Sequence, residues 1–237
     1  MNQRLLILGT VIAAPLLMTQ LARADLLITA NINGGGNVTV CSAANPNPSC
    51  NGTLSSGGIT LTTENANSNN PGTPSLADLL SSVGSITNNS GSTATIVLTI
   101  GDINFTLPTT PPTLDLHSQV GDTAVVGGAG DTFTYVSTVD QGNGQNTSPG
   151  TYNAPLVSLD LGSPSDNEFS NLLIANLSAP FSMTEVLRIT IAAGDVINYS
   201  SSTNLSPVPE PASLLLFGSG LLGLGWFGRR RRNRNAV

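Results

Sequence analysis

Short stretches rich in Val, Ile, Leu and Thr recur through the middle of this chain, separated by clusters of Gly, Pro and Asn. The clearest are residues 93–101 and 103–107, where apolar side chains alternate with Thr or Asn. Such alternation favours half-buried β-strands. Gly and Asn accept the positive φ of tight turns, and Pro presets other turn positions. The chain is therefore predicted to be mainly β, an antiparallel β-sandwich that is Ig-like or jelly-roll-like in general shape.

The same pattern predicts further strands at 26–32, 37–41, 59–63, 132–139, 156–161, 186–192 and 196–200. Two short helices are also predicted, one at 75–83 with a Ser75–Asp78 cap and one at 165–173 with a Ser165–Glu168 cap. Residues 64–75 and 140–154 are expected to be long exposed loops. Residues 200–207 are rich in Ser and Asn, and are expected to form a polar stalk.

Charge is distributed very unevenly along the chain. Arg188 is the only basic residue between Asp25 and Ser206, against thirteen Asp and Glu, which gives this body a net charge of −12. A protein that tracks nucleic-acid phosphates needs Lys and Arg to displace counterions. The composition therefore excludes a nucleic-acid binder, and it also excludes electrostatic binding of the body to anionic lipid.

Two cysteines are present, Cys41 and Cys50, on either side of the Pro-rich segment 45–48. In an oxidising compartment such a pair is expected to form one disulfide around a turn. A loop of this size would contribute about 2–3 kcal/mol to stability in the chain-entropy model. A metal pair is the alternative, but the sequence offers only one His.

The N-terminus has the organisation of a secretory signal peptide. Arg4 provides a positive start, residues 5–18 are largely apolar, and Ala22 and Ala24 stand at the −3 and −1 positions of a cleavage site. Cleavage is predicted between Ala24 and Asp25, so the body is expected to be exported. An uncleaved N-terminal anchor is the alternative.

The C-terminus combines an apolar segment with a basic end. Residues 212–227 contain no charged residue, and as a helix they would span roughly 24 Å, near the roughly 30 Å hydrocarbon core of a bilayer. Five arginines follow at once: Arg229, Arg230, Arg231, Arg232 and Arg234. Because arginine is costly to move across a membrane, this end is expected to stay in the cytoplasm and to stop transfer.

Val208, Pro209, Glu210 and Pro211, followed by the apolar segment and the Arg tract, resemble the PEP-CTERM sorting signal of exported bacterial proteins. The resemblance covers about residues 207–234. It implies that an exosortase, an integral-membrane processing enzyme, reads the motif at the outer face of the inner membrane and removes the tail. Retention of the helix as a permanent anchor is the alternative. The resemblance implies nothing about the activity of the body.

Candidate chemistry in the body is sparse. His117 is the single histidine, without a Gly-x-Ser-x-Gly elbow, and is expected to lie in an exposed loop. The many carboxylates could in principle serve glycoside hydrolysis, but most stand beside turn residues and few aromatic residues accompany them. Residues 140–146 alternate oxygen-bearing side chains as calcium loops do, although a solvated turn is the simpler interpretation. No catalytic, cofactor-binding or metal-binding residues are predicted.

The expected organisation is a signal peptide (1–24), a β-sandwich ectodomain (25–199), a stalk (200–207) and a sorting signal (208–237). The sorting signal divides into the motif (208–211), a transmembrane helix (212–228) and a cytoplasmic tail (229–237). The expected function is that of a non-enzymatic surface or extracellular-matrix protein without cofactor. Its expected partners are the membrane, an exosortase-type enzyme and exopolysaccharide, but no nucleic acid. A secreted carbohydrate-binding or calcium-dependent adhesion module is the alternative.

Overall fold

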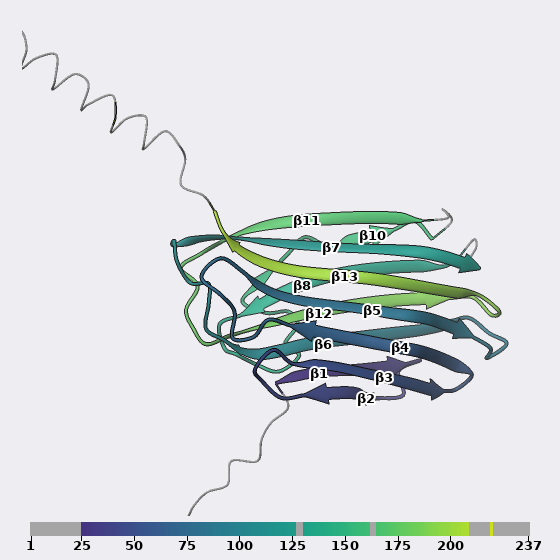
Figure 1. Ribbon diagram of the computed structural model, residues 1–237. Coiled ribbons are helices and arrows are strands. Elements are labelled where there is room, and N and C mark those ends of the chain that lie inside the picture. The colour runs from purple at the N-terminus through teal and green to yellow at the C-terminus, as the bar shows by residue number, and fades with distance from the viewer. Residues whose placement is uncertain (1–24, 127–129, 162–164, 209–218, 220–237) are drawn as a thin grey trace, which may run out of the picture.

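The computed structural model describes residues 25–126, 130–161, 165–208 and 219. Within them, thirteen strands form two antiparallel sheets that pack face to face, as Figure 1 shows. The predicted antiparallel sandwich is thus confirmed. The signal peptide, the tail beyond Val208 and the predicted transmembrane helix lie outside the described residues, apart from Ser219.

Seven strands form the first sheet, here called sheet A. Their order is β10 (Val157–Leu159), β8 (Thr132–Asp140), β12 (Phe181–Ile191), β6 (Ala94–Phe105), β1 (Leu26–Ile32) and β2 (Asn37–Ala43), with β9 (Tyr152–Asn153) paired to β8. Six strands form sheet B, in the order β11 (Asp166–Ala175), β7 (Thr113–Val126), β13 (Val196–Pro207), β5 (Ala77–Asn88), β4 (Ile59–Ser68) and β3 (Ser49–Ser56).

Most connections cross from one sheet to the other. From β5 to β8 each successive strand changes sheet, and so does each strand from β10 to β13. Double-sheet jelly rolls share such crossings. As a result β13, the last strand, lies inside sheet B between β7 and β5, and β12 lies inside sheet A between β8 and β6.

The core lies between the sheets and follows from the two-residue period of the strands. On β6 the side chains of Ala94, Ile96, Leu98 and Ile100 are fully buried, while the Thr residues between them face outward. Burying each large aliphatic side chain stabilises the fold by about 1.5–3 kcal/mol before entropy is counted.

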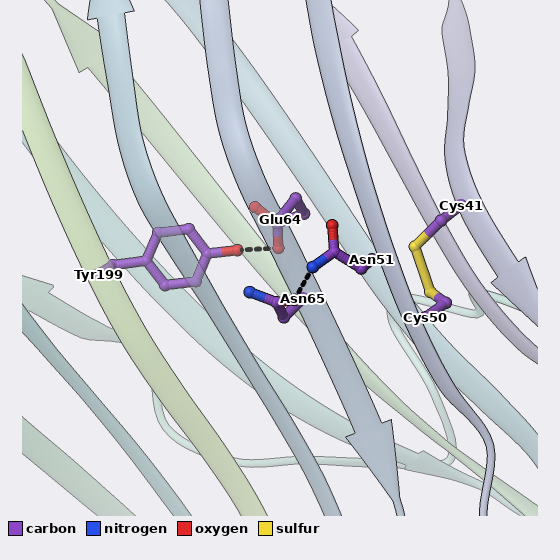
Figure 2. Close-up of a disulfide and its surroundings, with 6 residues drawn as sticks. All are labelled: Cys41, Cys50, Asn51, Glu64, Asn65 and Tyr199. Atoms are coloured by element: carbon purple, nitrogen blue, oxygen red, sulfur yellow. Dashed lines mark hydrogen bonds between the residues drawn. A yellow bond between two sulfur atoms is a disulfide. The ribbon is translucent and has the colours of Figure 1, made fainter.

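A disulfide joins Cys41 on β2 to Cys50 on β3, with 5.9 Å between the Cα atoms. Because β2 is the edge strand of sheet A and β3 that of sheet B, this bond ties the two sheets together along one side of the sandwich (Figure 2). The predicted pairing is confirmed.

Both predicted helices are wrong. Residues 77–88 form strand β5 and residues 166–175 form strand β11. The expected loop at 64–75 is shorter, since β4 continues to Ser68. The expected loop at 140–154 contains the short strand β9, and its amides bond to sheet A, as Gln145 does to the Gly101 carbonyl at 2.9 Å.

The predicted stalk is also wrong. Residues 200–207 are the second half of β13 and pair on one side with β5 and on the other with β7. The last pair with β7 joins Pro207 to Leu114. The folded body therefore reaches Pro207, so that no free spacer separates it from Val208.

Both ends of the body leave the sandwich at one end, here called the proximal end (Figure 1). Leu26 of β1 pairs with Asp102 near the end of β6, and Pro207 of β13 pairs with Leu114 near the start of β7. The connection 106–112 joins β6 to β7, so these two pairs lie at the same end. The proximal end also carries the connections 44–48 and 69–76.

Candidate functional site

The junction between the body and the C-terminal segment is tight. The Val208 N–H donates to the Thr113 carbonyl at 3.3 Å, which extends the pairing of β13 with β7 by one residue. Pro209, Glu210 and Pro211 come next in the sequence and lie outside the described residues, as do the five arginines of the tail. Val208 is thus the last described residue of the body that is held against the proximal end.

A second notable site is a buried carboxyl group in the centre of the sandwich. Glu185 on β12 points into the core and is fully buried. Its Oε1 accepts from Tyr135 Oη at 3.1 Å and from Thr203 Oγ1 at 2.9 Å. Its Oε2 accepts from Ser81 and Ser201 hydroxyls, each at 2.8 Å. Both sheets thus donate to one carboxyl group, since Tyr135 is on sheet A and the other three residues are on sheet B.

Burial raises the pKa of Glu185, and the four hydroxyl donors oppose that rise. The pKa of Tyr135 is raised well above its ordinary value by burial and by the nearby Glu185. More hydroxyls extend the network, because Ser137 contacts Thr203 at 2.6 Å and Ser118 at 2.7 Å. This cluster, Glu185 with its hydroxyl donors, is called the core hydroxyl network below.

A second buried acid, Glu64 on β4, lies close to this network. Tyr199 Oη donates to Glu64 Oε1 at 2.6 Å, as Figure 2 shows, while Oε2 has no hydrogen-bond partner. Burial raises the pKa of Glu64 to about 8; the Tyr199 hydrogen bond opposes the rise and the Glu185 charge adds to it. Glu64 is therefore protonated at neutral pH. Glu64 and Glu185 are both fully buried.

A groove of about 780 Å³ lies over strands β11, β7, β13 and β5 of sheet B. Amide and hydroxyl side chains dominate its lining, together with the carboxylates Asp122 and Asp166. The other polar lining residues are Gln119, Ser165, Asn167, Asn198, Ser200, Ser201 and Ser202. Among the described lining residues Tyr199 is the one aromatic residue, and its ring is buried. The groove can offer many hydrogen bonds to a hydroxyl-rich ligand.

His117 lies on strand β7 rather than in a loop, and is half-buried. Its Nδ1 is 2.7 Å from Asn171 Oδ1, and its ring lies 5.7 Å from that of Phe169 on β11. The imidazole thus belongs to a cross-strand contact on the face of sheet B, and the predicted loop position is wrong.

The segment at 140–146 forms a hydrogen-bonded turn. Asp140 Oδ2 accepts from the Gly144 N–H at 3.2 Å, and Oδ1 accepts from the Thr151 hydroxyl at 2.9 Å. Burial acts to raise the pKa of Asp140, but the hydrogen bonds from Thr151 and the backbone outweigh it and lower that pKa. Its carboxylate is thus committed to the turn.

Of the predicted cleavage pair, Asp25 is described and Ala24 is not. Sequence reasoning missed the roles of Glu64 and Glu185. One signal could have found Glu185, because it stands in phase with Leu187 and Ile189, which point into the core.

Two features are absent from the described part of the chain. No three His, Cys, Asp or Glu side chains gather there closely enough to hold a metal ion. No helix in that part has the length and apolar character needed to cross a membrane.

The family model described as the PEP-CTERM protein-sorting motif matches residues 207–232. No curated protein matches the chain. Among solved structures, TmCBM61 in complex with beta-1,4-galactotriose aligns at a TM-score of 0.34 and 7% identity, over 67% of this chain and 88% of that one. The enzymatically active domain of bacteriophage CBA120 tailspike protein 4 aligns at a TM-score of 0.30 and 8% identity, over 75% of this chain and 19% of that one. A structure described as carbohydrate-binding modules of the β-sandwich superfamily aligns at 0.30 and 8%, over 77% and 84%.

Proposed function

We propose that this chain, which carries a PEP-CTERM protein-sorting motif, is an exported, non-enzymatic protein of the cell surface or extracellular matrix. The signal peptide delivers the chain across the inner membrane, and the C-terminal helix holds it there with the Arg tail in the cytoplasm. An exosortase-type enzyme then processes the tail and releases the sandwich.

The observation that carries this proposal is the position of the motif. The family match begins at Pro207, the last residue of β13, so the sorting segment starts where the folded body stops. Each proline in Pro209-Glu210-Pro211 fixes φ and removes a backbone donor, which favours an extended segment that cannot continue the sheet. An extended segment is the form that a processing enzyme can bind.

The test is processing of the full-length chain in a bacterium that contains an exosortase. Glu210→Gln and Pro209→Ala are expected to leave the tail attached, so that the chain stays in the membrane fraction at the higher mass. Glu168→Gln is the matched control, because Glu168 is exposed on β11 far along the chain from the motif. Normal processing of both motif variants would refute the proposal.

Glycan binding is the second candidate, and the groove on sheet B favours it. Its amides, hydroxyls and carboxylates match the donors and acceptors of sugar hydroxyls. In affinity electrophoresis, exopolysaccharide from the host is expected to retard the chain, and Ser200→Trp, which fills the groove, should abolish the retardation. Thr99→Trp on the outer face of sheet A is the control. Equal mobility with and without polysaccharide would remove this candidate.

A further inference from the structure

Three buried side-chain oxygens without a hydrogen-bond partner belong to one corner of the proximal end. They are Asp102 Oδ1, Asn70 Oδ1 and Asn45 Oδ1. Asp102 is 0% exposed and Asn70 is 1% exposed, so solvent does not hydrate them freely. An unpaired buried carboxylate or amide oxygen carries a desolvation penalty of about 1–3 kcal/mol or more. Each of the three oxygens can therefore still accept a hydrogen bond or ligate a cation.

The Ile103 carbonyl brings these residues together. The amide groups of both Asn45 and Asn70 contact that carbonyl oxygen, Asn45 at 3.4 Å. Asp102 precedes Ile103, and its Oδ2 accepts from the Ser68 hydroxyl of β4. The corner therefore combines β6, the end of β4 and the connections 44–48 and 69–76.

Asp25 adds a second carboxylate. Its Oδ2 accepts from the Asn45 N–H at 3.1 Å and its Oδ1 from the Asn104 side-chain amide at 2.7 Å, which leaves each oxygen further lone pairs for a cation. Its backbone carbonyl accepts from the Ile103 N–H at 3.2 Å. Burial raises the pKa of the Asp102 carboxyl group to about 6. The nearby charge of Asp25 adds to this rise, whereas hydrogen bonds from Ser68 and Asn70 oppose it. Two carboxylates thus share one corner.

The body has almost no positive charge of its own to neutralise this corner. Arg188 is the only basic residue between 25 and 206. It is exposed on β12, five positions along the strand from Met183, the partner of Asp102. No basic side chain of the body therefore neutralises this corner.

We propose that this corner, formed by Asp25, Asn45, Asn70, Asp102 and the Ile103 carbonyl, is a calcium-binding site. All of its candidate ligands are oxygens: carboxylate, side-chain amide and backbone carbonyl. Calcium accepts six to eight such ligands in irregular geometry, whereas zinc prefers nitrogen and sulfur. In the structure both amides point their nitrogens at the Ile103 carbonyl, so calcium binding requires a half-turn of each amide that brings its oxygen toward the cation. The two aspartates match the charge of one Ca²⁺.

This site is distinct from the turn at 140–146, and the proposal does not depend on the sorting function. Bound calcium would join the start of β1 and two connections to the end of β6 and β4. It would therefore fix the end of the sandwich from which both termini leave. The extracellular medium contains calcium at concentrations that extracellular modules bind, with Kd of about 0.1–1 mM.

The test is thermal unfolding and titration calorimetry of the full-length chain in detergent, after removal of calcium with a chelator. At calcium about a hundredfold above Kd, mass action predicts that Tm rises by about 5–10 °C for a domain of this size. Magnesium chloride at the same concentration is expected to give a much smaller shift, because Mg²⁺ demands a regular octahedron.

Asp102→Asn and Asp25→Asn are expected to weaken calcium binding at least tenfold. Asp25→Asn covers the case in which Asp102→Asn does not fold. Asp131→Asn is the control, since Asp131 lies at the opposite end of the sandwich, where its Oδ1 accepts from the Ala192 N–H. Its calcium shift should equal that of the parent chain.

Three results would overturn the proposal. The first is that Tm does not shift with calcium up to about 10 mM, which is above the range that extracellular modules need. The second is that magnesium shifts Tm as much as calcium does. The third is that the calcium shift is undiminished in both Asp102→Asn and Asp25→Asn. The first result would point to neutralisation of Asp102 by a proton, or by the α-amino group of a chain cleaved before Asp25.

Discussion

The buried Glu64 makes a specific prediction about pH and stability. Its pKa is raised to about 8 in the folded chain, against an ordinary value of 4.5. Between these two pH values the folded chain holds a proton that the unfolded chain releases. Stability contributed by this group is therefore fully present below about pH 4.5 and is lost as pH rises through about 8.

The magnitude follows from the size of the shift. One pKa unit corresponds to about 1.4 kcal/mol, so a shift of this size changes the free energy of unfolding by roughly 4–5 kcal/mol between pH 4.5 and pH 8. That is a large part of the 5–15 kcal/mol typical of a whole domain. Glu185 is raised in the same direction and adds to the trend.

Glu64→Gln removes the titrating group while keeping the shape and an acceptor for Tyr199. Urea unfolding of the full-length chain in detergent, followed by far-UV circular dichroism at about pH 5, 6.5 and 8, measures the effect. Near pH 5 the two proteins are expected to differ little. At pH 8 the variant is expected to be more stable than the parent by about 4 kcal/mol. The free energy of unfolding of the parent falls by about 1.4 kcal/mol for each pH unit over the roughly 3 units from pH 5 to pH 8, whereas that of the variant does not.

The control is Glu168→Gln, which removes a carboxylate exposed on β11. Curves for parent and Glu64→Gln that stay parallel from pH 5 to pH 8 would refute this account of Glu64. A steeper fall of stability with pH in the variant than in the parent would refute it as well.

Two further predictions concern the core hydroxyl network and the disulfide. Ser81→Ala removes a hydrogen-bond donor to buried Glu185 and is expected to destabilise the fold by about 1–3 kcal/mol. Ser82→Ala, on the outer face of the same strand, should change stability by less than about 0.5 kcal/mol. Urea unfolding of both variants measures the difference, and equal effects would contradict the core hydroxyl network. Replacing Cys41 and Cys50 together by Ser is expected to lower stability by about 2–3 kcal/mol; an unchanged midpoint of unfolding would show that the cross-sheet bond contributes nothing.

The two largest errors of sequence interpretation have one physical cause. Ser81 on β5 and Ser201 and Thr203 on β13 point into the core, where a strand normally places apolar side chains. They do so because Glu185 accepts their hydroxyl groups. Ser81 interrupts the two-residue apolar period, so residues 75–83 look helical. Ser201 and Thr203 make residues 200–207 look like a polar stalk. Only their contact with Glu185 on β12 explains why these hydroxyl side chains point into the core.

Strand β11 was missed for another reason. Its Phe169 and Leu173 are 63% and 65% exposed, so the apolar pattern does not mark the buried face. The strand lies at the edge of sheet B and pairs only with β7. Edge strands with mixed faces give a weak two-residue signal, and the spacing of Phe169, Leu172 and Leu173 then resembles that of a helix.

Features that depend on residues close together in the sequence could be predicted from it. The strands at 26–32 and 132–139, the Cys41–Cys50 bond and the PEP-CTERM motif all rest on neighbours in the sequence. The corner around Asp102 and the core hydroxyl network could not be predicted, because their members come from strands and connections far apart in the chain.

The central claim is that the folded body ends at Pro207 and is released from the segment that follows it. The intact mass of the protein recovered from an exosortase-containing host, in membrane and released fractions, tests this most directly. A released chain that begins at Asp25 and ends within residues 208–211 is the predicted result. A membrane-bound chain that still contains Arg229 through Val237 would contradict it, and would make the protein an anchored ectodomain.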